Sequence, residues 1–137
     1  MKNNIKIISA VLLLFISNKA FSQLDTLNYL KTNFEIQKSQ YIGQPFSVLL
    51  NNMTQIQPKT AWSHSGSWKR NERNFTNFRF TFMEASFYNA VTLQIDWQDT
   101  IPANDIKFYE NKNGFYFTNE EKFFYGNKII KDIRVYR

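Results

Sequence analysis

The chain contains no cysteine and only one histidine among its 137 residues, and both shortages limit its chemistry. Without cysteine it has no disulfide, no thiol nucleophile and no lipid-modified amino-terminal cysteine. A zinc centre draws on several cysteine and histidine ligands, of which this sequence supplies only His64. We therefore expect no metal site and no cofactor, and a fold that is stable without covalent cross-links.

The chain also lacks an apolar run long enough to cross a membrane. Residues 7–16 are almost wholly apolar, whereas about 20 such residues are needed to span the hydrocarbon core. Two lysines precede this run, and the small residues Ala20 and Ser22 follow it in the pattern that signal peptidase accepts. The sequence therefore predicts a signal peptide at 1–22 and a mature chain at 23–137, exported to the periplasm or the extracellular space and without a transmembrane segment.

Loss of this leader lowers the positive charge. The signal peptide carries Lys2, Lys6 and Lys19 and no acid, so its removal takes the net charge from +6 to +3. A charge of this size is ordinary for a soluble domain, whereas nucleic-acid-binding domains usually have a concentrated basic face. We therefore expect no nucleic-acid partner.

Two helices are expected at the start of the mature chain. The first spans residues 25–38 with Asp25 or Thr26 as its N-cap, and the second begins at Pro45. In both, apolar residues recur at three- and four-residue spacing, which is typical of an amphipathic helix. The residues on these two stripes are Leu27, Leu30 and Phe34, followed by Phe46, Leu49, Leu50 and Met53.

Alternating apolar residues predict strands farther along the chain. The alternation covers residues 78–82 and 91–97, and the short connection at 84–89 indicates an antiparallel pair. A further strand is expected within 60–69. The last strand is expected at 128–136, with Ile129, Ile133 and Val135 on one face even though Lys131 shares that face.

Helical signals lie between the expected strand at 91–97 and the last strand. Thr100 is a candidate cap for a helix that begins near Pro102 and ends at Gly114, and Thr118 with Glu121 forms a capping box. The order predicts a single α+β domain with two amino-terminal helices and a small antiparallel sheet of three or four strands. One or two short helices are inserted before the last strand.

Several segments resemble small exported proteins of Bacteroidetes, such as those of flavobacteria, whose activity is uncharacterised. They are Tyr41-Ile-Gly-Gln-Pro-Phe-Ser-Val-Leu-Leu50, Phe115-Tyr-Phe-Thr-Asn-Glu-Glu121, Tyr125-Gly-Asn-Lys and the terminal Ile133-Arg-Val-Tyr-Arg. The resemblance spans most of the mature chain and implies a Gram-negative envelope, without site residues. The expected architecture is also similar to that of β-lactamase inhibitor proteins and of small accessory proteins of outer-membrane protein assembly, which favours binding over catalysis.

The stretch from Ala61 to Arg70 has the composition of a binding loop. It contains two tryptophans around a polar, glycine-containing segment and ends in two cations. Such residues stack on rings, pair with phosphate or carboxylate, and dominate protein interfaces. The candidate binding residues are Trp62, His64, Trp68, Lys69 and Arg70. The alternative is that one or both indoles belong to the core and that the polar segment is simply a hairpin tip.

The leading hypothesis is a non-catalytic exported protein that binds a protein or glycan partner in the cell envelope. The alternative is a small hydrolase of envelope polymers that uses dispersed carboxylates, with His64 assisting. Ser63 and Ser65 flank this histidine, but adjacent residues seldom form a catalytic pair, and the G-x-S-x-G nucleophile motif is absent. A closed cleft that joins the histidine and an acid would favour the hydrolase, whereas exposed indoles on a shallow surface would favour binding.

Overall fold

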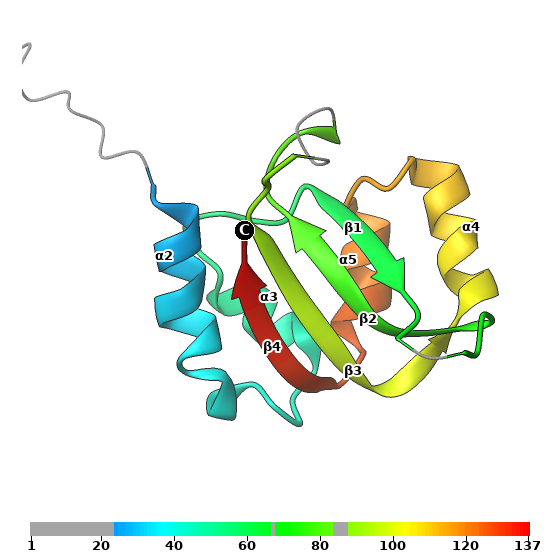
Figure 1. Ribbon diagram of the computed structural model, residues 1–137, viewed down its shortest axis with the longest axis horizontal. Helices are drawn as coiled ribbons and strands as arrows, with labels where there is room; N and C mark the ends of the chain where they lie inside the picture. The colour runs from blue at the N-terminus through cyan, green and yellow to red at the C-terminus, as the bar shows by residue number, and fades with distance from the viewer. Residues whose placement is uncertain (1–23, 67, 84–87) are drawn as a thin grey trace, which may run out of the picture.

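The computed structural model describes residues 24–66, 68–83 and 88–137 (Figure 1). The expected signal peptide and most of the expected 84–89 connection lie outside the described residues. In the described part of the chain, an antiparallel sheet is covered on one face by helices, so the predicted α+β class is confirmed. No helix in this part is long and apolar enough to cross a membrane.

The sheet has four strands that lie side by side in the order of the chain. Every neighbouring pair is antiparallel. The strands are β1 (Thr60–His64), β2 (Glu72–Arg79), β3 (Thr92–Pro102) and β4 (Ile130–Tyr136).

Alternation along the strands gives the sheet a buried inner face and a polar outer face. Phe78 pairs with Ala61 on β1 and with Leu93 on β3, and Leu93 pairs with Val135 on β4. All four side chains are buried. Neighbouring residues in these strands point to the opposite face because the side-chain period of a strand is two.

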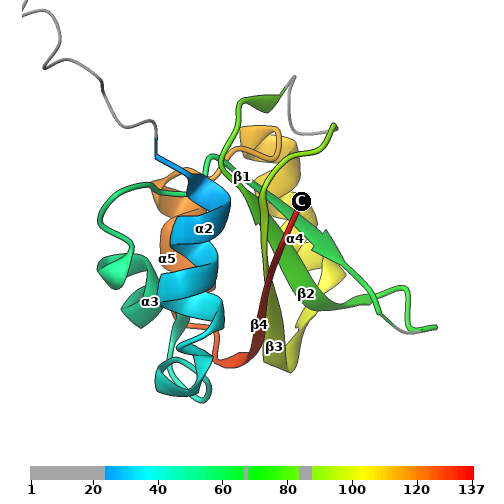
Figure 2. The same ribbon diagram turned by 60° about the vertical axis from the view of Figure 1, so that its left-hand side comes forward.

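The helical layer lies on the inner face. Figure 2 shows α2, α3 and α5 on the same side of the sheet, while Figure 1 shows α4 beyond β1 at the edge. The helices are α2 (Thr26–Leu30), the π-helical turn η1 (Lys31–Glu35), the 3₁₀ turn η2 (Lys38–Gln40), α3 (Phe46–Asn52), α4 (Ala103–Asn113) and α5 (Asn119–Gly126).

The expected helix at 25–38 is interrupted. The Asp25 side chain accepts a hydrogen bond from the Asn28 amide, as expected of an N-cap, but after Leu30 the chain widens into η1. Phe34 in this turn lies with its ring centroid 5.7 Å from the rings of both Tyr29 and Tyr41. The wider turn thus coincides with the burial of Phe34 between two aromatic rings.

Strand β2 is longer and begins earlier than the alternation at 78–82 predicts. It runs from Glu72 and ends at Arg79, so Phe80 is buried but Phe82 is 65% exposed. The expectation that Phe82 shares the buried face was wrong, because the strand ends before it. The Lys59 ammonium lies 3.9 Å from the centroid of the Phe82 ring and covers part of it.

In β4 the inward residue is Ile130 rather than Ile129. The register between β3 and β4 shifts between Asp96 and Trp97, so Asp96 pairs with Asp132 while Trp97 pairs with Ile130. The extra residue at this bulge is Lys131, which is exposed. Because of the bulge, Lys131 stays in solvent while Ile130, Ile133 and Val135 are buried.

A chain of polar groups crosses the inner face and ties the sheet to α5. Thr76 Oγ1 accepts a hydrogen bond from Trp97 Nε1 at 2.9 Å and lies 2.7 Å from Ser63 Oγ. Ser63 Oγ also hydrogen-bonds with the Tyr125 hydroxyl at 2.9 Å. Burial raises the pKa of Tyr125 to about 12. Each polar side chain thus has a partner, as burial requires.

Both outer strands have partners along their edges. On β1, the Ala61 amide donates to the Phe115 carbonyl at 3.0 Å, and the Phe117 amide donates to the Lys59 carbonyl at 2.8 Å. On β4, the Ile130 amide donates to the Gln44 carbonyl at 3.0 Å.

Two carboxylates accept hydrogen bonds from further backbone amides of β4. Val135 donates its amide hydrogen to Glu35 Oε1 at 2.7 Å, and Ile133 donates to Asp132. Burial alone would raise the pKa of Asp132. Hydrogen bonds from Lys38 and the Ile133 amide outweigh it and hold this pKa below its usual value.

Candidate functional site

All five candidate binding residues lie on the β1–β2 hairpin, but in two different places. Trp62 and His64 belong to β1, whereas Trp68, Lys69 and Arg70 lie in the connection to β2. We call the part at β1 the hairpin base, and we call the described residues of the connection, Ser65, Gly66, Trp68, Lys69 and Arg70, the hairpin tip. The two parts offer different surfaces.

At the hairpin base, Trp62 is packed rather than free. Its indole stacks on Phe115 with ring centroids 4.2 Å apart and planes 12° from parallel, and its Nε1 donates to Thr60 Oγ1 at 3.1 Å. The Arg79 guanidinium carbon lies 5.7 Å from the centroid of the indole. One face of Trp62 is therefore covered by another ring, and the side chain is half-buried on the outer face.

The partner ring depends on an unusual backbone. Gly114 ends α4 in the left-handed conformation with φ of +59°, and Phe115 follows with φ of +66°. A left-handed residue with a large side chain is rare and costs free energy. Phe115 is held there by the stack on Trp62 and by the hydrogen bond from the Ala61 amide to its carbonyl.

His64, at the end of β1, is exposed and lies in cationic surroundings. Its ring centroid is 5.3 Å from that of Phe75, with the planes 27° apart. Burial lowers the pKa of His64, and the charges of Arg79 and Arg73 lower it further. The ring is therefore neutral at neutral pH. The described charges that act on it are cations, and no described carboxylate bonds to it as one would in a catalytic pair.

The hairpin tip presents an indole and a guanidinium to solvent. Trp68 is as exposed as in an extended peptide, at 102% of the reference area. Lys69 Nζ lies 3.7 Å from Glu72 Oε1, a weak pair at an exposed position. Among the residues that the structure describes, none forms an ion pair or hydrogen bond with the Arg70 guanidinium.

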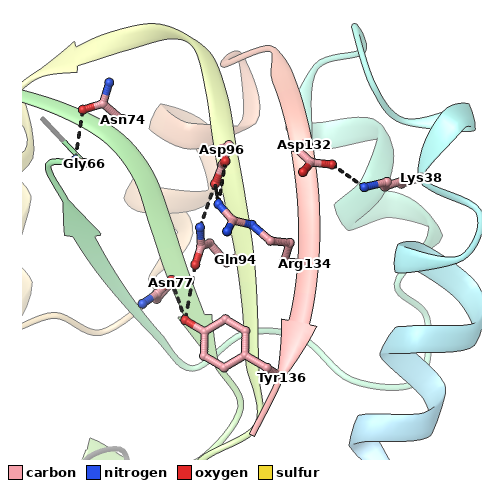
Figure 3. A network of polar contacts seen from close by, with 9 residues as sticks. All are labelled: Lys38, Gly66, Asn74, Asn77, Gln94, Asp96, Asp132, Arg134 and Tyr136. Carbon is pink, nitrogen blue, oxygen red and sulfur yellow. Dashed lines mark hydrogen bonds and ion pairs between the residues drawn. The ribbon is translucent and has the colours of Figure 1, made fainter.

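Hydrogen bonds brace the backbone of the tip. Ser65 Oγ donates to the Lys69 carbonyl at 3.0 Å, and Arg73 Nη1 donates to the Arg70 carbonyl at 2.8 Å. The Gly66 amide donates to Asn74 Oδ1 at 3.2 Å (Figure 3). The tip is therefore tied to β2 from both of its ends.

A shallow hollow of about 450 Å³ lies at the tip. Ser65, Gly66, Trp68 and Arg70 line it. Trp68 and Arg70 thus border one open space, together with the polar Ser65. Such a set can stack on a ring, pair with an anion and hydrogen-bond with a hydroxyl, but it contains no nucleophile with an activating base.

Sequence reasoning missed a polar network on the outer face (Figure 3). Arg134 Nη2 donates to Asp96 Oδ2 at 2.8 Å, and Gln94 Nε2 donates to Asp96 Oδ1 at 2.8 Å. The Tyr136 hydroxyl donates to Gln94 Oε1 at 3.3 Å and also lies 3.5 Å from Asn77 Oδ1. The polar positions that alternate with apolar ones in β3 and β4 were the available signal. These groups bond to one another, so the network stiffens the sheet.

Two acids share a small enclosed space near α4 and α5. Glu110 and Glu121 line a cavity of about 10 Å³ together with Tyr125. Burial raises the pKa of Glu110, against the opposing charges of Arg73 and Lys107. A cavity of this size holds about one water molecule. It has no room for a sugar or peptide substrate.

Comparisons with protein-family models, with curated proteins and with solved structures found no match for this chain. In the described residues, no cluster of three or more histidine, aspartate and glutamate side chains could hold a metal ion.

Proposed function

We propose that the protein is an exported, non-catalytic binding protein of the cell envelope and that the hairpin tip contacts its partner. The observation that carries this proposal is the complete exposure of Trp68 near Arg70, whose guanidinium has no ion-pair or hydrogen-bond partner among the described residues. Tryptophan and arginine are the residues most enriched at interface hot spots, and a tryptophan with no packing role contributes little to folding.

The bracing of the tip supports the same function. Binding costs less conformational entropy when the contacting loop is already ordered. Hydrogen bonds from Ser65, Gly66 and Arg73 hold the described backbone at the two ends of the tip. These hydrogen bonds therefore lower the entropy cost of ordering the two ends of the tip on binding.

The surroundings of the ionisable groups give the hydrolase alternative less support. His64 has cationic neighbours, and the half-buried Glu110 and the buried Glu121 line a space that admits no polymer. A glycoside hydrolase needs two carboxyl groups on either side of a substrate-sized cleft. These acids lack such a cleft.

Binding to isolated cell envelopes tests the role of the tip. Labelled mature protein, residues 23–137, is expected to bind envelopes of the source cells saturably, and Trp68→Ala to weaken this binding about tenfold or more. Phe123→Ala is the matched control, because Phe123 is another aromatic residue that is 77% exposed, on α5. Equal binding by wild type and Trp68→Ala, or equal losses in the two variants, would contradict the proposal.

Export has its own test. Mass spectrometry of the native protein from the envelope and medium is expected to find an amino terminus at Gln23. An intact chain that begins at Met1 in the cytosolic fraction would contradict the export proposal.

A further inference from the structure

The hairpin tip has the chemistry to recognise an acidic sugar. We infer that it binds a polysaccharide that carries carboxylate groups, with Trp68 stacked on a sugar ring and Arg70 paired with the carboxylate. This inference rests on the proposed binding function of the tip and names the class of partner.

The shape of the hollow indicates a segment of a long ligand. Its volume of about 450 Å³ is within the range of about 300–1,000 Å³ that is usual for ligand sites. It is nevertheless wide open, whereas small-molecule sites bury most of their ligand. An open hollow of this size fits one or two rings of a chain that continues beyond the protein surface.

The lining selects a ring with a carboxylate. The indole of Trp68 is a flat apolar surface that matches the C–H face of a pyranose ring. The Arg70 guanidinium presents its donors in a planar fork that fits both oxygens of a carboxylate. Ser65 also lines the hollow, and its hydroxyl donates a hydrogen bond to the Lys69 carbonyl.

The charges around the tip favour an anion over a neutral sugar. Lys69 is partly neutralised by Glu72 at 3.7 Å, whereas Arg70 has no described acid beside it. An acidic sugar supplies the counter-charge that Arg70 lacks among the described residues, and a neutral sugar does not.

Two other polyanions fit the site less well. Single-stranded nucleic acid stacks successive bases on several aromatic rings, but the neighbouring indole of Trp62 is covered by Phe115 at 4.2 Å. Recognition of anionic lipid usually takes a cluster of about 4–8 cations, whereas the tip offers Lys69 and Arg70. Both polyanions are included in the test as outcomes.

Titration with defined probes tests the inference. A hexamer of galacturonic acid is the acidic probe, and a hexamer of galactose is its neutral counterpart. We expect the acidic hexamer to bind mature wild-type protein and to shift the tryptophan emission to shorter wavelength as Trp68 is covered. The neutral hexamer is expected to bind at least about tenfold more weakly, because the guanidinium–carboxylate pair is missing.

Variants locate the binding. Arg70→Ala and Trp68→Ala are each expected to weaken binding of the acidic hexamer about tenfold or more. Lys131→Ala removes an exposed cation on β4 and Phe123→Ala removes an exposed ring on α5, and both should bind as wild type does. Unchanged melting temperatures establish that the tip variants remain folded.

The possible failures can be told apart. The inference is wrong if the acidic hexamer does not bind, if the neutral hexamer binds equally well, or if phosphatidylglycerol vesicles or a thymidine 12-mer bind more tightly. If envelope binding depends on Trp68 but excess acidic hexamer does not compete with it, the inference fails while the proposed binding function stands. If envelope binding is indifferent to Trp68→Ala, both fail.

Discussion

At the base of the β1–β2 hairpin, Trp62 lies 4.2 Å from the ring of Phe115 and donates a hydrogen bond to Thr60, whereas Trp68 at the tip is fully exposed. The same residue type thus has two roles within one hairpin. At the base, the indole contributes packing free energy to the fold. At the tip, it contributes little to the fold and remains available to a partner. Stability and binding should therefore respond to different substitutions.

The largest loss of stability is expected beneath the hairpin base. Phe78 is fully buried and packs on Phe46, with ring centroids 4.7 Å apart, and on Trp97 and Tyr125. Phe78→Ala should lower the free energy of unfolding by about 3–5 kcal/mol, because it leaves a cavity in the core. Urea denaturation measures this change. A loss below about 1 kcal/mol would mean that the core beneath the hairpin can collapse around the gap.

A smaller loss is expected at the base itself. Trp62→Ala removes a half-buried ring and its stack on Phe115, which should lower the free energy of unfolding by about 2 kcal/mol. A double-mutant cycle with Phe115→Ala should give a coupling energy of about 1 kcal/mol. Additive losses would show that the two rings do not support each other.

The free energy of unfolding should also depend on alkaline pH through Tyr125, which lies beneath the hairpin base. Its pKa is raised to about 12 in the folded protein, whereas an unfolded tyrosine titrates near pH 10. Between these values the unfolded chain loses the proton and the folded chain keeps it, so the free energy of unfolding falls as pH rises. Tyr125→Phe should cost about 1 kcal/mol at pH 7, through loss of the Ser63 hydrogen bond.

The same variant should reduce the alkaline loss of stability. Unfolding curves at pH 8 to 11 for wild type and Tyr125→Phe measure the difference, and absorbance titration of the phenols gives the pKa directly. Parallel decreases in both proteins across this range would refute the assignment to Tyr125.

The smallest effect on stability is expected at the tip. Trp68→Ala should change the free energy of unfolding by no more than about 0.5 kcal/mol, because the exposed indole has no packing role in the described fold. Thermal and urea denaturation provide the measurement. A loss comparable to that of Trp62→Ala would erase the distinction between base and tip.

Local chemistry made several parts of the fold predictable. Asp25 and the pair Thr118 and Glu121 cap their helices as their spacing indicates, and Gly114 ends α4 in the left-handed conformation. These features depend on residues within one turn of each other. The alternation of Leu93, Ile95 and Trp97 likewise identified the buried face of β3.

Features that depend on distant residues could not be predicted in this way. The inward position of Ile130 depends on a bulge between β3 and β4, and the bond from Arg134 to Asp96 depends on the resulting register. In the candidate site, composition identified both indoles. Their different roles depend on Phe115, which the left-handed turn at the end of α4 places against Trp62.

The hydrogen-bonded edges of the sheet restrict how a partner can attach. Many binding proteins accept a peptide by β-augmentation, in which the peptide adds as a new strand. Here Glu35 and Asp132 occupy two amides of β4, and the segment around Phe115 occupies β1. An added strand therefore cannot pair with the backbone of β1 or β4 at these positions. The same contacts protect the two edge strands from pairing with another copy of the chain, which could lead to aggregation. Under the proposed binding function, recognition therefore falls to side chains, and substitutions at the tip leave the backbone hydrogen bonds of the sheet intact.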